Sequence, residues 1–266
     1  MRLVKAHAKD KPLFLYVPFN AVHAPHQVPD KYKEPYKNLP EPRRTYAGML
    51  AAMDEAIGQI LSALDESGRR TNALIFFSSD NGGPNPRRLT SNGPLRAGKG
   101  TLYEGGVQVV ACAAWAGHIK PGSVVRTPMH VTDLYPTFLK LAGAALEQKF
   151  PLDGVDVLAC LTDGKPSPRK EFLLNATPTK GAIRVDDWKL VVNGNAPEPG
   201  EGEDGAGNAS PATQPALKTS LALFDLAADP SEKTNLAEEK PEQTKQLRLR
   251  YEALAKEAVQ PRNIKR

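Results

Sequence analysis

The first half of the chain alternates short apolar runs with helical periodicity. Residues 12–19 (PLFLYVPF) and 72–79 (NALIFFSS) are apolar runs of strand length. Between them, residues 45–68 place apolar side chains at three- and four-residue spacing, which predicts an amphipathic helix that ends near Gly68. Strand, helix and strand in this order predict a parallel α/β unit, and residues 106–115 (GVQVVACAAW) predict a further strand.

The pattern changes after about Pro166. Residues 182–193 (AIRVDDWKLVVN) and 221–230 (LALFDLAADP) predict strands of an antiparallel sheet. A charged stretch over residues 239–260 predicts a surface helix that closes the chain. The second half therefore looks like a small sheet with one helix.

The change of pattern predicts two domains. Residues 1–165 form the expected α/β core and residues 166–266 the expected C-terminal subdomain. Within the subdomain, residues 194–219 are rich in glycine, proline and acidic residues, and we expect a disordered insert there.

Composition excludes some classes of function. The 266-residue chain has a net charge of +5, but its basic residues are scattered and lack interleaved aromatics, so we expect no nucleic-acid partner. No apolar stretch reaches the roughly 18 residues that a membrane span needs. The two cysteines, Cys112 and Cys160, form no CxxC metal motif.

A glycine-rich stretch, GPLRAGKGT (residues 93–101), resembles a phosphate-binding P-loop. A P-loop follows a strand, opens a helix and carries Ser or Thr directly after its lysine. Here loop-forming residues precede the motif, Gly100 follows Lys99, and the β-rich run after Gly105 is no helix. The context excludes a nucleotide loop and leaves Lys99 as a binder of another anion, or as a solvated loop lysine.

Two polar clusters follow the predicted strands. His23 lies just after the first apolar run, and Asp80 and Asn81 come directly after the second. In parallel sheets the functional residues gather at the carboxyl ends of strands. Carboxylate and amide oxygens suit a hard cation such as Ca²⁺, although Asp-Asn-Gly-Gly is also a strong turn former.

Four segments in order carry a family resemblance: VPFNAVHAPHQVP, FFSSDNGG, GPLRAGKGTLYEGG and LALFDLAADPSEKTNLAEEKPE. Together they resemble the formylglycine-dependent sulfatases, most closely the arylsulfatase B-like branch. The resemblance implies the C-terminal part of an alkaline-phosphatase-like α/β sandwich. That fold has a mostly parallel sheet, followed by a small C-terminal antiparallel sheet and helix.

The resemblance also implies roles for five residues. Asp80 and Asn81 match the family ligands of the active-site Ca²⁺. His23 matches the histidine that contacts the sulfate and protonates the departing alcohol, and Lys99 matches the lysine that binds a sulfate oxygen. Arg96 lies in the same motif as Lys99 and is expected to support substrate binding. His26 is a second candidate in the loop of His23.

The family nucleophile has no counterpart in this sequence. Formylglycine is made from the first residue of a Cys/Ser-x-Pro-x-Arg motif, which neither cysteine begins, and Ser167-Pro168-Arg169 has the wrong spacing. The paired aspartates that complete the family's cation site are absent as well. We therefore expect the nucleophile-bearing part to precede this portion, and expect this chain alone to be inactive with an incomplete Ca²⁺ site.

Three functional hypotheses remain open. The first is a sulfuric ester hydrolase represented by its C-terminal portion. The second is a phosphatase or phosphodiesterase of the same superfamily, which the few histidines disfavour. The third is a non-catalytic remnant that binds sulfated glycans or a protein partner. The expected substrate is an aryl or glycan sulfate ester. The family is mostly exported, but the sequence itself leaves the compartment open.

Overall fold

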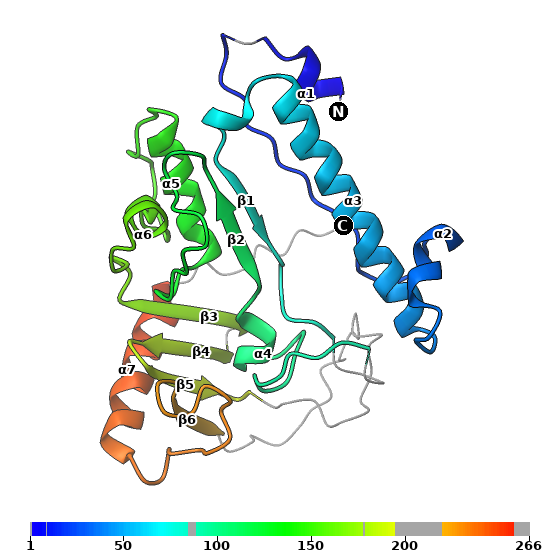
Figure 1. Ribbon diagram of the computed structural model, residues 1–266. Helices are drawn as coiled ribbons and strands as arrows, with labels where there is room; N and C mark the ends of the chain where they lie inside the picture. The colour runs from blue at the N-terminus through cyan, green and yellow to red at the C-terminus, as the bar shows by residue number, and fades with distance from the viewer. Residues whose placement is uncertain (1, 9, 85–88, 178, 195–219, 258–266) are drawn as a thin grey trace, which may run out of the picture. The chain divides into compact units, whose positions relative to one another are not determined.

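The computed structural model describes residues 2–8, 10–84, 89–177, 179–194 and 220–257 (Figure 1). The chain divides into two compact units. We call residues 1–77 and 111–168 the first unit, and residues 78–110 and 169–266 the second unit. The second unit therefore combines a stretch from the middle of the sequence with the whole C-terminal part.

The longest helix of the first unit is α3 (Arg43–Glu66), which confirms the helix predicted from apolar spacing. It ends at Ser67, and Gly68 follows with a φ of 69°, the left-handed conformation in which glycine commonly terminates helices. Arg69 fixes the N-terminal residues to this end of the helix, because its Nη2 donates to the carbonyls of His7 and Ala8, each at 2.8 Å.

The remaining elements of the first unit are short. Strands β1 and β2 pair in a two-stranded sheet. Their bounds and those of the surrounding helices are β1 (Ile75–Ser78), β2 (Ala111–Ala114), α1 (Arg2–Ala6), α2 (Asp30–Lys33), η1 (Glu34–Tyr36), η2 (Arg70–Asn72), η4 (Val131–Asp133), α5 (Leu134–Leu141) and α6 (Leu158–Asp163). Asp133 is fully buried, and its carboxylate accepts from the backbone N–H groups of His130 and Val155 at 2.8 and 3.0 Å.

The strand expected over residues 12–19 is not formed. Among the described residues no segment forms a ladder with it, and Phe14 and Tyr16 are each 76 % exposed. An apolar run becomes a strand only where a neighbour supplies hydrogen bonds and covers its side chains. The mostly parallel sheet stays a prediction, since the described strands form only the β1–β2 pair and an antiparallel sheet.

The second unit is built on a four-stranded antiparallel sheet in the order β3-β4-β5-β6, and thus contains the expected C-terminal sheet and helix. Its strands are β3 (Glu171–Thr177), β4 (Lys180–Val185), β5 (Trp188–Val192) and β6 (Leu221–Asp225), and its helices are α4 (Glu104–Val107) and α7 (Pro241–Glu257). Strands β4 and β5 form a tight hairpin in which Val185 pairs with Trp188.

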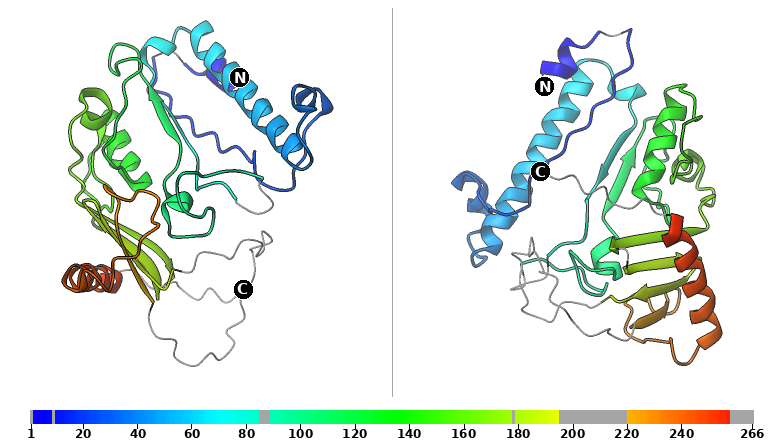
Figure 2. Two further views of the ribbon diagram at one scale, coloured as in Figure 1. Left: turned by 60° about the horizontal axis from the view of Figure 1, so that its bottom comes forward. Right: turned by 180° about the vertical axis from the view of Figure 1, so that it is seen from behind.

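Both faces of this sheet are covered. On one face Ile183, Leu190 and Leu223 are paired across the strands, and they pack against Leu247 and Tyr251 of α7. Figure 2 shows α7 lying along the sheet.

The opposite face packs against the stretch that precedes and includes α4. Here Ala182, Val191 and Phe224 form one cluster with Leu102 and Tyr103. Strand alternation explains why the two apolar clusters lie on different faces of the sheet, because successive side chains of a strand point to opposite faces. The motif that carries Lys99 is thus part of the core of the second unit.

The predicted insert over residues 194–219 lies, apart from Gly194, outside the described residues. The last stretch of the first unit ends at Pro168, and the domain boundary expected between residues 165 and 166 stays a prediction. Among the helices that the structure describes, none is long and apolar enough to cross a membrane.

Candidate active site

Asp80 and Asn81 lie directly after β1, where the chain enters the second unit. Ser79 secures the start of this turn, because its N–H donates to the carbonyl of Val110 at 3.0 Å and its hydroxyl donates to the carbonyl of Asn81 at 2.9 Å. The side chain of Asp80 is exposed, and Asn81 is half-buried. Gly82 then donates to the carbonyl of Gly106 at 2.9 Å. The backbone of the turn is held on both sides while the Asp80 carboxylate faces solvent.

Asn92 connects this turn with the motif of Lys99. Its Oδ1 accepts from the Gly83 N–H at 2.9 Å, and its Nδ2 donates to the carbonyls of Gly83 and Ala97 at 2.7 and 3.1 Å. The N–H of Lys99 donates to the Gly83 carbonyl at 3.2 Å. No local pattern marks this role of Asn92, because an Asn-Gly pair is typical of any turn.

Lys99 lies at the tip of a tight turn. Gly98 before it is buried, and Thr101 closes the turn by donating its N–H and its hydroxyl to the Gly98 carbonyl at 3.1 and 2.7 Å. Gly100 adopts a φ of 83°. The side chain of Lys99 is exposed. An ammonium group on a fixed backbone is suited to binding an oxyanion. The run around Gly105 was wrongly expected to contain no helix, since α4 forms there. Because α4 has only four residues, the motif still lacks the long helix of a P-loop.

Glycines allow the two segments to approach closely. A Cβ on Gly82 would lie 1.7 Å from the Gly105 carbonyl oxygen, and a Cβ on Gly105 would lie 2.3 Å from that of Arg96. A Cβ on Gly106 would lie 2.4 Å from the carbonyl oxygen of Thr101. Because each of these neighbours is backbone, it cannot move aside as a side chain would. Glycine is therefore required by packing at Gly82, Gly105 and Gly106.

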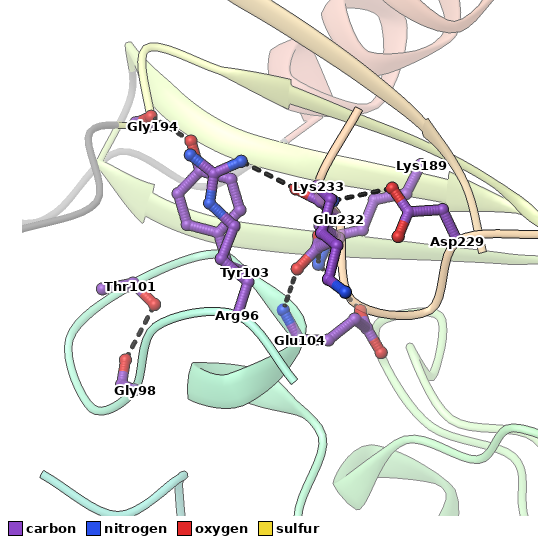
Figure 3. A network of polar contacts seen from close by, with 10 residues as sticks. All are labelled: Arg96, Gly98, Thr101, Tyr103, Glu104, Lys189, Gly194, Asp229, Glu232 and Lys233. Carbon is purple, nitrogen blue, oxygen red and sulfur yellow. Dashed lines mark hydrogen bonds and ion pairs between the residues drawn. The ribbon is translucent and has the colours of Figure 1, made fainter. Parts of the chain in front are cut away.

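Arg96 is enclosed by aromatic and backbone groups of the second unit. Its guanidinium lies 4.1 Å over the Tyr103 ring, and its Nη1 donates to the Glu232 carbonyl at 2.8 Å (Figure 3). The guanidinium also lies 5.9 Å from the centre of the Phe224 ring. Tyr103 in turn donates its hydroxyl to the carbonyl of Gly194 at 2.8 Å. These contacts order the loop, and substrate binding by Arg96 stays a prediction.

Beneath this loop lies a buried ionic cluster that we call the Lys189 triad, composed of Lys189, Glu104 and Glu232. The Nζ of Lys189 lies 2.7 Å from Oε1 of Glu104 and 2.9 Å from Oε1 of Glu232. The Glu104 N–H donates to Oε2 of Glu232 at 2.6 Å. Burial raises the pKa of Glu232, and the Lys189 charge opposes this rise. Lys189 and Glu232 were not predicted as site residues from the sequence.

His23 lies in the first unit and is exposed. Its N–H donates to the Asn20 carbonyl at 2.9 Å, and its Nδ1 lies 2.8 Å from the carbonyl of Ala24. Because a carbonyl only accepts, Nδ1 carries the proton, which leaves Nε2 as the nitrogen that can exchange one with a substrate. The alternative candidate His26 is half-buried with its ring edge-on to Tyr46, at 5.7 Å between ring centres.

The predicted site residues are thus divided between the units. The structure brings Asp80, Asn81 and Lys99 onto one hydrogen-bonded backbone framework in the second unit. Convergence of His23 with them stays a prediction. Asp80 and Asn81 offer the kind of oxygen that Ca²⁺ prefers, but the described residues contain no group of three or more His, Cys, Asp or Glu side chains able to hold a metal. The side-chain oxygens of Asp80 and Asn81 are of the type that Ca²⁺ binds, but two residues supply fewer ligands than a Ca²⁺ site needs.

Comparisons with known proteins place the chain in a family. The sulfatase family model matches residues 1–144. Arylsulfatase J of Mus musculus is 34 % identical over 97 % of this chain and 48 % of its own length, and arylsulfatase A of Homo sapiens is 33 % identical over 88 % and 46 %. The chain therefore belongs to the sulfatase family, and it spans about half the length of these relatives.

A solved structure gives the same result at the level of the fold. The protein described as Ps i-CgsB, in complex with k-i-k-neocarrahexaose, matches with a TM-score of 0.81 and 30 % identity. The match covers 98 % of this chain and 53 % of that protein. The PsFucS1 sulfatase of Pseudoalteromonas sp. also matches, with a TM-score of 0.63 and 29 % identity over 79 % of this chain and 42 % of that protein. The fold is therefore that of the sulfatases, and the family model and the arylsulfatase relatives confirm the resemblance drawn from the four sequence motifs.

Proposed function

We propose that this chain carries the sulfate-binding and part of the cation-binding machinery of a sulfuric ester hydrolase. The observation that carries the proposal is the framework in which Gly83 bonds to both Asn92 and Lys99, and Gly82 bonds to Gly106. These hydrogen bonds join the turn that carries Asp80 and Asn81 to the loop that carries Lys99, which supports joint action of the two segments on a cation and an anion. A cation and an ammonium group so placed are the components that a sulfuryl-transfer site needs.

Each residue then has a chemical task. Lys99 offsets negative charge on the sulfuryl oxygens, and Asp80 with Asn81 supplies oxygen ligands to Ca²⁺, which would polarise the sulfate ester when bound. His23 donates a proton from Nε2 to the departing alcohol oxygen, for which an imidazolium is suited near neutral pH. The formylglycine nucleophile and the remaining cation ligands come from sequence outside this chain, and this chain alone does not hydrolyse sulfate esters.

The proposed substrate is a sulfate ester of an aryl alcohol or of a sugar. The names of the matched proteins support both classes, since they include arylsulfatases and an N-acetylgalactosamine-6-sulfatase of Mus musculus at 31 % identity. A steryl-sulfatase of Mus musculus at 32 % identity keeps steroid sulfates open as a third class. The oligosaccharide held by the structural relative supports the sugar alternative.

The test begins with the gene. The DNA upstream of Met1 is read for an in-frame Cys/Ser-x-Pro-x-Arg motif, and the polypeptide that includes it is produced with an enzyme that installs formylglycine. Hydrolysis of 4-methylumbelliferyl sulfate, with much slower hydrolysis of the corresponding phosphate, supports the proposal. A stop codon with no such motif would favour the non-catalytic remnant, and preferential phosphate hydrolysis would favour the phosphatase.

A further inference from the structure

Lys189 is a lysine with no exposed surface in the interior of a β-strand. The register places it beside Phe224 of β6 and Arg184 of β4, on the sheet face that packs against Leu102 and Tyr103. A buried ammonium group is costly to desolvate unless it is paired. Here two carboxylates pair with it, Glu104 from α4 and Glu232 from the turn after β6. The cluster joins three stretches of chain that are far apart in the sequence.

Glu104 is connected, through the two glycines that follow it, to both segments of the candidate site. Glu104 begins α4, and Gly105 beside it donates to the Arg96 carbonyl at 2.8 Å, which closes the loop that carries Lys99. Gly106 accepts from Gly82 at 2.9 Å, which fixes the turn that carries Asp80 and Asn81. A shift of Glu104 would therefore move both segments together.

The Glu232 end is held in place independently. Glu232 has a φ of 52°, a left-handed conformation that costs a non-glycine residue free energy and persists only where surrounding contacts enforce it. Asp229 supplies these contacts, because its carbonyl accepts from Glu232 at 3.1 Å and its Oδ2 accepts from Lys233 and Thr234 at 2.6 and 2.9 Å. Glu232 accepts two hydrogen bonds, one at Oε2 from the Glu104 N–H and one at its backbone carbonyl from the Arg96 guanidinium (Figure 3).

We propose that Lys189 is a positioning residue of the sulfatase site, which fixes the Lys99 loop and the Asp80–Asn81 turn through Glu104 and Glu232. Buried ion pairs add little net stability over an apolar cluster of the same size, whereas their directional contacts can specify one arrangement. In this protein the contacts of the Lys189 triad specify the position in which α4 packs on the sheet. The catalytic part of this proposal rests on the proposed function; the structural part does not.

The test has two independent readouts on Lys189→Met. In the first, backbone hydrogen exchange is measured on this full chain. We expect exchange of the Lys99, Gly105 and Gly82 amides to rise by about tenfold or more, since these amides donate the hydrogen bonds that hold the loop, while the β4–β5 amides keep their protection.

In the second readout, kinetics are measured on the intact sulfatase. We expect kcat for 4-methylumbelliferyl sulfate to fall about 100-fold, because small misplacement of catalytic groups carries that penalty, with a smaller change in KM.

The matched control is Arg250→Met, which breaks an exposed pair between α7 and Glu171 on the same sheet and should leave both readouts unchanged. If Lys189→Met does not fold, Glu104→Gln removes one charge at nearly constant shape and should raise exchange at the same amides.

Unchanged exchange at these amides in Lys189→Met, or in Glu104→Gln if that is the variant that folds, would overturn the proposal. So would loosened amides with wild-type kcat. An intact wild-type protein without sulfatase activity would instead refute the proposed function, and the exchange result would still decide whether the triad seats the loop.

Discussion

The guanidinium of Arg96 lies 4.1 Å over the ring of Tyr103. The two residues flank the Lys99 turn, so their contact closes the base of the loop while Lys99 remains exposed at its tip. The loop is thus ordered by its contacts with the sheet of the second unit. The Lys99 side chain takes no part in these contacts.

Replacing Arg96 should therefore destabilise the second unit even in the absence of substrate. Arg96→Met removes the cation–π contact and the hydrogen bond to the Glu232 carbonyl, and we expect the free energy of unfolding to fall by roughly 1.5–3 kcal/mol. Urea denaturation measures this change. The control Arg248→Met removes an exposed pair with Glu252 and should change the same quantity by less than about 0.5 kcal/mol. Equal effects of the two variants would contradict the ordering role.

A methyl group on Gly105 should displace the loop. Its Cβ would lie 2.3 and 2.4 Å from the carbonyl oxygens of Arg96 and Ala97, so Gly105→Ala should lower the free energy of unfolding by roughly 1–3 kcal/mol. Gly58 in α3 offers the opposite case. No atom lies within 4 Å of a Cβ built there, and Gly58→Ala should raise stability by about 0.4–1 kcal/mol. Thermal unfolding of both variants tests whether stability falls for Gly105→Ala and rises for Gly58→Ala. Unchanged stability of Gly105→Ala would contradict the close contact between Gly105 and the carbonyl oxygens.

The Lys189 triad should give stability a defined pH dependence. Burial raises the pKa of Glu232 above its ordinary value of 4.5. The folded state then holds this proton more tightly than the unfolded chain does. The resulting contribution is fully present below about pH 4.5 and is lost as pH rises through the raised pKa of the folded state.

Glu232→Gln abolishes this titration. We expect the unfolding free energy of the variant, minus that of the wild type, to increase with pH above about 4.5 and then level off. Urea denaturation of both proteins from pH 4 to 8 measures the difference. A difference that is constant or that falls with pH would show that the pKa of Glu232 is not raised in the folded protein.

Elements with strong local patterns were predictable from the sequence. The three- and four-residue spacing in α3 and the apolar runs of β1 and β5 were sufficient to predict these elements, because the periodicity of apolar residues is a local property of each segment. The run over residues 12–19 was wrongly expected to form a strand, since strand pairing depends on a partner that the run itself does not encode.

The residues that order the site were harder to predict. Asn92 and Glu232 act through distant parts of the chain, and nothing in their local sequence marks them. Lys189 did leave a signal. In the run Trp188–Val192 it shares a face with Val191, so strand alternation places a charge beside an apolar side chain that packs in the core. A lysine in such a position implies a buried partner.

The most direct measurement is kcat/KM for 4-methylumbelliferyl sulfate of the intact, formylglycine-bearing protein, with Lys99 replaced by methionine. Loss of the ammonium group that stabilises charge on the sulfuryl oxygens should lower kcat/KM by about 10²–10³-fold, with folding unchanged because the Lys99 side chain is exposed. Turnover by Lys99→Met at the wild-type rate would contradict the account.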